Sequence, residues 1–169
     1  MKLSGGRLDF AIIGEPRRWD RITLGYKGSA YAAVTLRRAV AHSAAREENA
    51  CEAAIATWKT IQDWYEAYNT SYSRTFEKVN ASIRGMASGS DGLEEWARLD
   101  LGVRLPTDIN PDDWYRVLSG LAKGAEVKIN GFAISAYQAE KNTTLVRAFL
   151  AAIRSRGGKA QFCTENRDR

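Results

Sequence analysis

Apolar residues recur with a helical period from residue 47 to residue 87, and no other pattern in the chain is as long. On a helical wheel of 100° per residue, the large apolar side chains fall within an arc of about 120°, and the charged side chains fall on the opposite side. The apolar set is Trp58, Ile61, Trp64, Tyr65, Tyr68, Tyr72, Phe76, Val79, Ile83 and Met86. This pattern predicts one long amphipathic helix.

The predicted helix is longer than a compact chain of this size is wide. About forty helical residues extend about 60 Å, whereas a compact chain of 169 residues is about 40 Å across. The poor helix formers of residues 69–73 (NTSYS) are the place for a kink. Because the apolar arc keeps its phase across them, we expect an unbroken or mildly bent helix, whose projecting end suits contact with a second copy. Its aromatic residues are then core and not a stacking platform.

Capping residues and glycines predict three to four shorter helices, and apolar runs bounded by turn residues predict short strands. The predicted helices cover residues 29–45, 93–100, 110 to 120 or 124, and 142 or 143 to 157. The predicted strands cover residues 7–13, 21–26 and 159–163, with a hairpin of residues 127–129 and 132–134 about Asn130-Gly131. The first two strands are expected to pair as another hairpin.

These elements predict an α+β fold, in which the long helix and the shorter helices pack with a small, mainly antiparallel sheet. With 169 residues and 44% hydrophobic content, the chain can form one sizeable core. We therefore expect a single globular domain over residues 1–164 and a frayed tail over residues 165–169. No apolar run has the length of a signal peptide or a membrane span, which favours a cytoplasmic protein without membrane contact.

Charge is distributed unevenly, with +6 over residues 1–46, −5 over residues 47–130 and +4 over residues 131–169. Basic ends suit an anionic partner, so we expect a non-enzymatic protein that binds nucleic acid or a nucleoprotein complex. The predicted contact residues are Arg17, Arg18, Trp19, Arg21, Lys27, Arg37, Arg38, Arg147, Arg154 and Arg156. Trp19 is included for base stacking because it lies in the charged turn of residues 15–21.

Two other functions stay open at this stage. The long helix and the acidic middle also suit a protein-interaction module, either an assembly subunit or a small phage-type inhibitor that blocks a nucleic-acid-processing complex. An enzymatic site would centre on Lys27, Ser29 and His42, where the GYKGS turn could bind a phosphate. The two cysteines and single histidine lack metal-site spacing, so neither a metal nor a cofactor is predicted.

Overall fold

The computed structural model describes residues 12, 18–40 and 47–165, except for the side chains of residues 164 and 165. The chain divides into two compact units. The first is drawn from the residues up to Gly25 and from Ala139–Glu165, and the second spans Tyr26–Gln138. The single domain expected over residues 1–164 stays a prediction.

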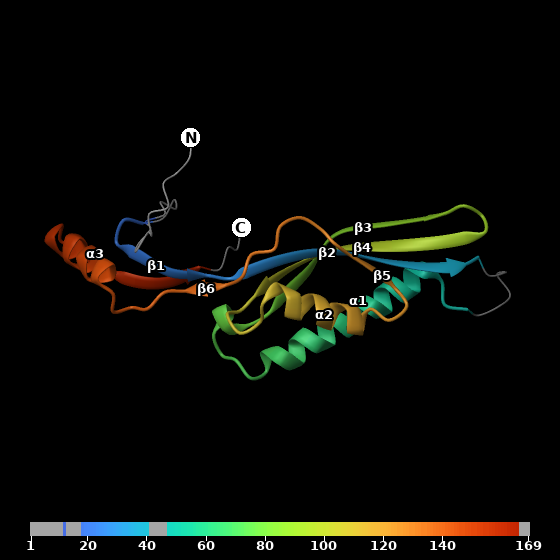
Figure 1. Ribbon diagram of the computed structural model, residues 1–169, viewed down its shortest axis with the longest axis horizontal. Coiled ribbons are helices and arrows are strands. Elements are labelled where there is room, and N and C mark those ends of the chain that lie inside the picture. Colours follow the sequence, from blue (N-terminus) through green and yellow to red (C-terminus); the bar gives the residue numbers. More distant parts are fainter. Residues whose placement is uncertain (1–11, 13–17, 41–46, 166–169) are drawn as a thin grey trace, which may run out of the picture. The chain divides into compact units, whose positions relative to one another are not determined.

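The second unit is a four-stranded antiparallel sheet with two helices along one face (Figure 1). The strand order is β3-β4-β2-β5. The strands are β2 (Gly28–Ala39), β3 (Asn80–Ser90), β4 (Glu94–Leu105) and β5 (Glu126–Ile129). β2 pairs with β4 over its full length, so the centre of the sheet is held by two twelve-residue strands.

The two helices begin at capping residues. In α1 (Ala50–Asn69), the Asn49 side chain accepts a hydrogen bond from the Glu52 backbone N–H at 2.8 Å, and the Glu52 carboxylate accepts one from the Asn49 backbone N–H at 3.0 Å. In α2 (Pro111–Leu121), the Asn110 side chain accepts from the Asp113 amide at 2.9 Å. The prediction that a helix starts at Asn110-Pro111 is therefore confirmed, because that signal is local.

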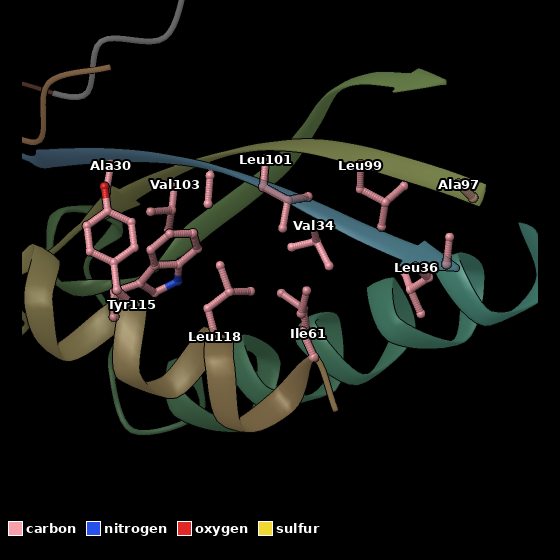
Figure 2. Close-up of a cluster of buried hydrophobic side chains, with 14 of the residues drawn as sticks. Ala30, Val34, Leu36, Ile61, Ala97, Leu99, Leu101, Val103, Tyr115 and Leu118 are labelled. Atoms are coloured by element: carbon pink, nitrogen blue, oxygen red, sulfur yellow. The ribbon is translucent and has the colours of Figure 1, made fainter. Parts of the chain in front are cut away.

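The hydrophobic core lies between the helices and the sheet, as Figure 2 shows. Val34 and Leu36 of β2 and Leu99 and Leu101 of β4 point toward the helices, and Ile61 of α1 points back at them. The α1 aromatic residues Trp58, Trp64, Tyr65 and Tyr68 pack against this cluster while partly buried. Their predicted role as core residues is confirmed.

The predicted long helix is wrong. α1 ends at Asn69, and a short 3-10 helix (η1, Thr75–Glu77) and β3 follow it. The Asn69 amide exchanges two hydrogen bonds with the Val79 backbone, at 2.7 and 2.8 Å, and so joins the end of the helix to the start of the sheet. Val79 and Ile83 fitted the helical wheel of the predicted helix because residues four apart lie on one face of a helix and also on one face of a strand.

Two other predicted helices are strands. The alanine-rich segment expected to run from Ser29 to Ala45 is β2 as far as Ala39, and residues 41–46 lie outside the described part. The segment 93–100 belongs to β4 from Glu94 onward. β2 lies between β4 and β5, and this long-range pairing outweighs the helix propensity of alanine.

The predicted Asn130-Gly131 hairpin is also wrong. The Asn130 backbone N–H donates to Tyr31 O of β2 at 3.0 Å. Ile134 then pairs with Ser29, which also belongs to β2, so residues 127–129 and 132–134 do not pair with each other. The chain therefore leaves β2 briefly and returns to the same edge. Gly131 supplies the positive φ of +66° that this excursion requires. With three α-helices and two sheets among the described residues, the expected fold class is not the one observed.

The first unit has its own small core of Ile22, Leu24, Val146 and Ile153. Its elements are β1 (Arg21–Tyr26), α3 (Thr144–Ser155) and β7 (Gln161–Glu165), and the second sheet of the chain has the order β6-β1-β7, with β6 at Tyr137–Gln138. The strand over residues 21–26 and the helix capped at Thr143 are confirmed.

The predictions for the two ends of the chain and for a membrane span have different outcomes. The strand predicted over residues 7–13 lies outside the described residues, apart from Ile12. The predicted last strand is confirmed in part, since β7 starts two residues later and includes Glu165 of the expected tail. Within the part that the structure describes, no helix is both long enough and apolar enough to cross a membrane.

Candidate functional site

The four-stranded sheet has one apolar face and one polar face. Directly paired residues of neighbouring strands point to the same side. The pairs Val34 with Leu99 and Ala32 with Leu101 face the helices and are buried. The intervening pairs, such as Thr35 with Arg98, therefore face the other side. That side carries cations from all four strands and is our candidate functional site.

We call this surface the arginine face. Its cations come from four strands and outnumber its carboxylates, so the face has a net positive charge. The cationic members are Arg37 on β2, Arg84 on β3, Arg98 and Arg104 on β4, and Lys128 on β5, and the carboxylates are Glu94 and Asp100 on β4 and Glu126 on β5.

Arg84 lies flat across the middle of the arginine face. A Cβ atom at Gly102 would come within 2.7 Å of Arg84 Cδ, so the absence of a side chain at Gly102 makes room for it. The Arg84 guanidinium carbon lies 5.7 Å from the centre of the Tyr31 ring, which is within the range of a cation–π contact. Because the β-bulge between Ile83 and Gly85 falls at Arg84, the strand can turn this side chain onto the face.

Two further contacts organise the end of the face near the β3–β4 turn. Arg98 donates to Asp100 at 3.0 Å, which offsets part of its charge. The Trp96 ring covers Gly89, where a Cβ atom would lie 2.9 Å from the ring. This end of the face therefore combines the Trp96 ring with an Arg98 side chain whose charge is partly offset.

The opposite end of the face is polar and more buried. The buried Lys27 ammonium donates to Asn80 Oδ1 at 2.6 Å and to the carbonyl oxygens of Thr75 and Lys78. Arg104 stands between Ser29 and Asn80 in the strand register. Within the described residues no hydrogen bond or ion pair engages the Arg104 guanidinium. Arg104 can therefore offer all its donors to a carboxylate or phosphate.

The structure does not gather the residues predicted to bind nucleic acid. Arg37 is on the arginine face, while Arg38 pairs with Glu48 at 3.4 Å, and Lys27 bonds to backbone carbonyls rather than projecting toward a ligand. In the first unit, Arg18 pairs with Asp20, and the Trp19 ring lies against Gly158. Arg21, Arg147, Arg154 and Arg156 are exposed there, and Arg17 and His42 fall outside the described residues. The binding role of these residues stays a prediction.

Sequence reasoning missed Arg84, Arg98 and Arg104. The signal for two of them was present, because from Ala97 to Leu105 apolar residues alternate with Arg98, Asp100, Gly102 and Arg104. Such alternation is typical of a half-buried strand and places Arg98 and Arg104 on its open side. Arg84 gave no comparable signal, since its orientation depends on a bulge and on Gly102 of the neighbouring strand.

A separate polar cluster lies beyond β4. The hydroxyls of Tyr68 and Tyr72 each donate to Asp108 Oδ2 at 2.7 Å, and the two rings stack at 4.9 Å. Partial burial opposes ionisation of Asp108, but the two hydroxyl donors outweigh it and hold the pKa of that carboxyl below its usual value. Burial, reinforced by the hydrogen bonds, raises the pKa of Tyr68. The cluster ties the end of α1 to the loop before α2.

On the helix side, a pocket of about 460 Å³ lies between α1, α2 and the end of β2. Its lining is mostly small or apolar side chains, with Arg38, Glu48 and Lys123 as its charged residues. Arg38 and Glu48 are already paired with each other. The arginine face is therefore the better candidate for binding an anionic group.

No match to a protein-family model was found for the chain. The chain is 31% identical over 163 residues to the [LysW]-lysine hydrolase of Deinococcus radiodurans, covering 92% of this chain and 44% of that protein. It is 26% identical to a putative [LysW]-lysine/[LysW]-ornithine hydrolase of Thermococcus kodakarensis, covering 89% of this chain and 38% of that protein. The chain thus spans less than half the length of these curated relatives.

Solved structures of two peptidases share the fold. A tripeptidase from Staphylococcus aureus superimposes with a TM-score of 0.61 at 16% identity, covering 87% of this chain and 40% of that chain. The M20 family metallo-carboxypeptidase Sso-CP2 from Sulfolobus solfataricus gives a TM-score of 0.62 at 15% identity, covering 87% of this chain and 53% of that chain. The chain has the fold of part of each peptidase.

These comparisons correct the functional predictions. The relatives that match about nine-tenths of the chain are named as hydrolases, so the prediction of a non-enzymatic nucleic-acid-binding or phage-type protein is wrong. A nucleic-acid partner receives no support from them.

One of the similar structures is named a metallo-carboxypeptidase, which raises the question of metal ligands in this chain. In the described residues, no group of three or more His, Cys, Asp or Glu side chains is placed to hold a metal ion. These residues therefore do not fit a metal centre, and we derive no chemical step through one.

Proposed function

We propose that this chain is part of a hydrolase that acts on [LysW]-lysine or a closely related conjugate. The observation that carries the proposal is the 31% identity to the Deinococcus radiodurans [LysW]-lysine hydrolase over 92% of the chain. The fold shared with two peptidases supports it, since peptidases also hydrolyse bonds to amino acids.

The arginine face supplies a physical reason for the chain's part in such a reaction. An amino acid such as lysine has a carboxyl group, and the planar guanidinium of arginine binds a carboxylate through two parallel hydrogen bonds. Arg104 suits this role because no described residue occupies its donors. The ordered side chain of Asn80, held by Lys27, lies opposite Arg104 in the register and adds a further polar group. We assign substrate binding, and no bond-breaking step, to these residues.

The test is release of free lysine from [LysW]-lysine by the intact protein that contains this chain, followed by mass spectrometry. We expect release by the wild-type protein, and a fall of about 10- to 100-fold in kcat/KM for Arg104→Ala. This range corresponds to loss of a charged hydrogen bond worth about 1.5–3 kcal/mol. Arg116→Ala is the matched control, because Arg116 is an exposed arginine on α2, paired with Asp113.

Two results would contradict the proposal at different levels. If the wild-type protein releases no lysine from the conjugate, the assigned reaction is wrong. If it does so, but Arg104→Ala and Arg116→Ala have equal activity, the arginine face does not bind the substrate.

A further inference from the structure

The pocket on the helix side of the sheet is separate from the arginine face, which lies on the other side. It is formed where α1, α2 and the end of β2 meet, and its volume is about 460 Å³. Pockets that bind small molecules have volumes of about 300–1,000 Å³ and are mainly apolar, with a few placed polar groups. The size of this pocket therefore suits a small organic ligand.

The wall of the pocket is mainly apolar. Leu36 of β2 and Leu121 of α2 contribute the large apolar side chains. Figure 2 shows Leu36 pointing from the sheet toward the helices. Ala53 and Ala56 of α1 and Gly120 of α2 are too small to fill the space between the two helices. The pocket can therefore bury an aliphatic group, which the open arginine face cannot do.

One buried polar side chain in this wall has no partner. Thr57 is only 8% exposed, and within the described residues no hydrogen bond engages its hydroxyl. The neighbouring Thr60, in contrast, donates to Ala56 O at 3.0 Å. Buried hydroxyls are nearly always hydrogen-bonded, because an unsatisfied one destabilises the protein. A ligand with an oxygen atom in the pocket would supply the partner that Thr57 lacks.

The charged residues of the pocket favour one negative group in the ligand. Arg38, Glu48 and Lys123 together carry one net positive charge. Arg38 and Glu48 pair with each other at 3.4 Å. The Lys123 ammonium makes no ion pair or hydrogen bond with a described residue. Lys123 is therefore the cation that is available to an anion in the pocket.

We propose that this pocket is a binding site for a small aliphatic carboxylate. The aliphatic body of the ligand lies against Leu36 and Leu121, where it is removed from water. Its carboxylate accepts hydrogen bonds from the Thr57 hydroxyl and from Lys123. The flexible four-carbon stem of lysine lets the ammonium follow the ligand to this position.

Calorimetric titration of the intact protein with isocaproate tests the site. We expect a dissociation constant of about 1 mM or lower. Isocaproamide has the same shape without the charge and should bind at least about 10-fold more weakly, since charged hydrogen bonds are the stronger ones. Lys123→Ala should weaken isocaproate binding by a similar factor. Lys59→Ala is the matched control, because Lys59 is an exposed lysine of α1 that pairs with Asp63 outside the pocket.

Thr57→Val separates a binding role from a structural one. Valine keeps the shape of threonine and removes the hydroxyl, so it should weaken isocaproate binding by about 3- to 10-fold. The stability of the unliganded variant to urea should be unchanged or higher, because the hydroxyl that is removed has no partner. A hydroxyl with a purely structural role would show the reverse, with stability lost and binding unchanged.

Free leucine distinguishes two sources of such a ligand, because it adds an ammonium group that Glu48 can accept. Tighter binding of leucine than of isocaproate identifies an amino acid, and weaker binding identifies a simple carboxylic acid.

Three results would overturn the proposal: no binding of either compound at about 10 mM, equal binding of isocaproate and isocaproamide, or equal isocaproate binding by Lys123→Ala and Lys59→Ala. The titration measures binding and not turnover, so failure of the hydrolase proposal would not affect it.

Discussion

Replacement of Asn69 by leucine tests what ends α1 and starts the sheet. The Asn69 amide donates to Val79 O at 2.8 Å and accepts from Val79 N at 2.7 Å. Val79 is 0% exposed, so water cannot replace either bond. Leucine has a similar shape and no polar group, and it leaves a buried N–H and a buried C=O without partners.

The expected loss follows from these two groups. Each unsatisfied group costs about 1–3 kcal/mol, and the half-buried leucine recovers less than about 1 kcal/mol by burial of apolar surface. For the two groups together, the net loss in the free energy of unfolding is therefore about 1–6 kcal/mol. With a urea m-value of about 2 kcal/mol/M, the midpoint should fall by about 0.5–3 M.

Urea unfolding followed by tryptophan fluorescence measures this change, because Trp58, Trp64, Trp96 and Trp114 all lie in the second unit. Asn142→Leu is the control, since Asn142 is exposed and, among the described residues, its side chain accepts a single long hydrogen bond, from Arg147 at 3.4 Å. We expect it to change stability by less than about 0.5 kcal/mol. A loss of less than about 1 kcal/mol for Asn69→Leu would refute the reasoning, because the amide would then not be what joins helix and sheet.

Three further predictions concern stability and ionisation. Gly28→Ala should lower the free energy of unfolding in urea by about 1–3 kcal/mol, because the added Cβ would lie 2.7 Å from Ile134 O and 2.8 Å from Ala136 N. Gly102→Ala is the control and should cost less, because its Cβ meets the flexible Arg84 side chain. Equal losses for the two variants would contradict this. Asn110→Ala should lower the free energy of unfolding by about 1 kcal/mol, because the α2 cap is lost. An unchanged free energy of unfolding would show that the cap does not stabilise the protein. Tyr68→Phe should raise the pKa of Asp108 in an NMR titration, since one of its two hydroxyl donors is lost. Because folding lowers the pKa of Asp108, its contribution to the free energy of unfolding is complete above the pKa of the unfolded state and is lost as pH falls through the folded value. In the Tyr68→Phe variant this loss should begin at a higher pH. An unchanged Asp108 pKa in the variant would contradict the role of the contact.

Local signals predicted the elements that depend on neighbouring residues. The cap at Asn110, the cap at Thr143 and the glycine after α3 appear in the structure where the sequence places them, because each acts through hydrogen bonds or a positive φ within a few residues. The strand over residues 21–26 was also predicted with the observed bounds.

The segments that were mispredicted are those whose partners are far away in sequence. β2 reads as an alanine-rich helix by propensity, but its partners in β4 lie about seventy residues along the chain. The residues of the candidate site also come together only through long-range pairing. Arg84, Arg98 and Arg104 are spread over twenty residues, and only the pairing of β3 with β4 places them on one surface.

By itself, the sequence determined where helices α2 and α3 begin, which aromatic residues of α1 become core, and that basic residues are abundant enough to form a positive surface. Tertiary structure alone decided that α1 stops at Asn69, that β2 and β4 are strands, and which arginines share a face. The reason is physical: caps and apolar periodicity act within one or two turns, whereas the choice between helix and strand for a small-residue segment depends on the long-range neighbours that bury it.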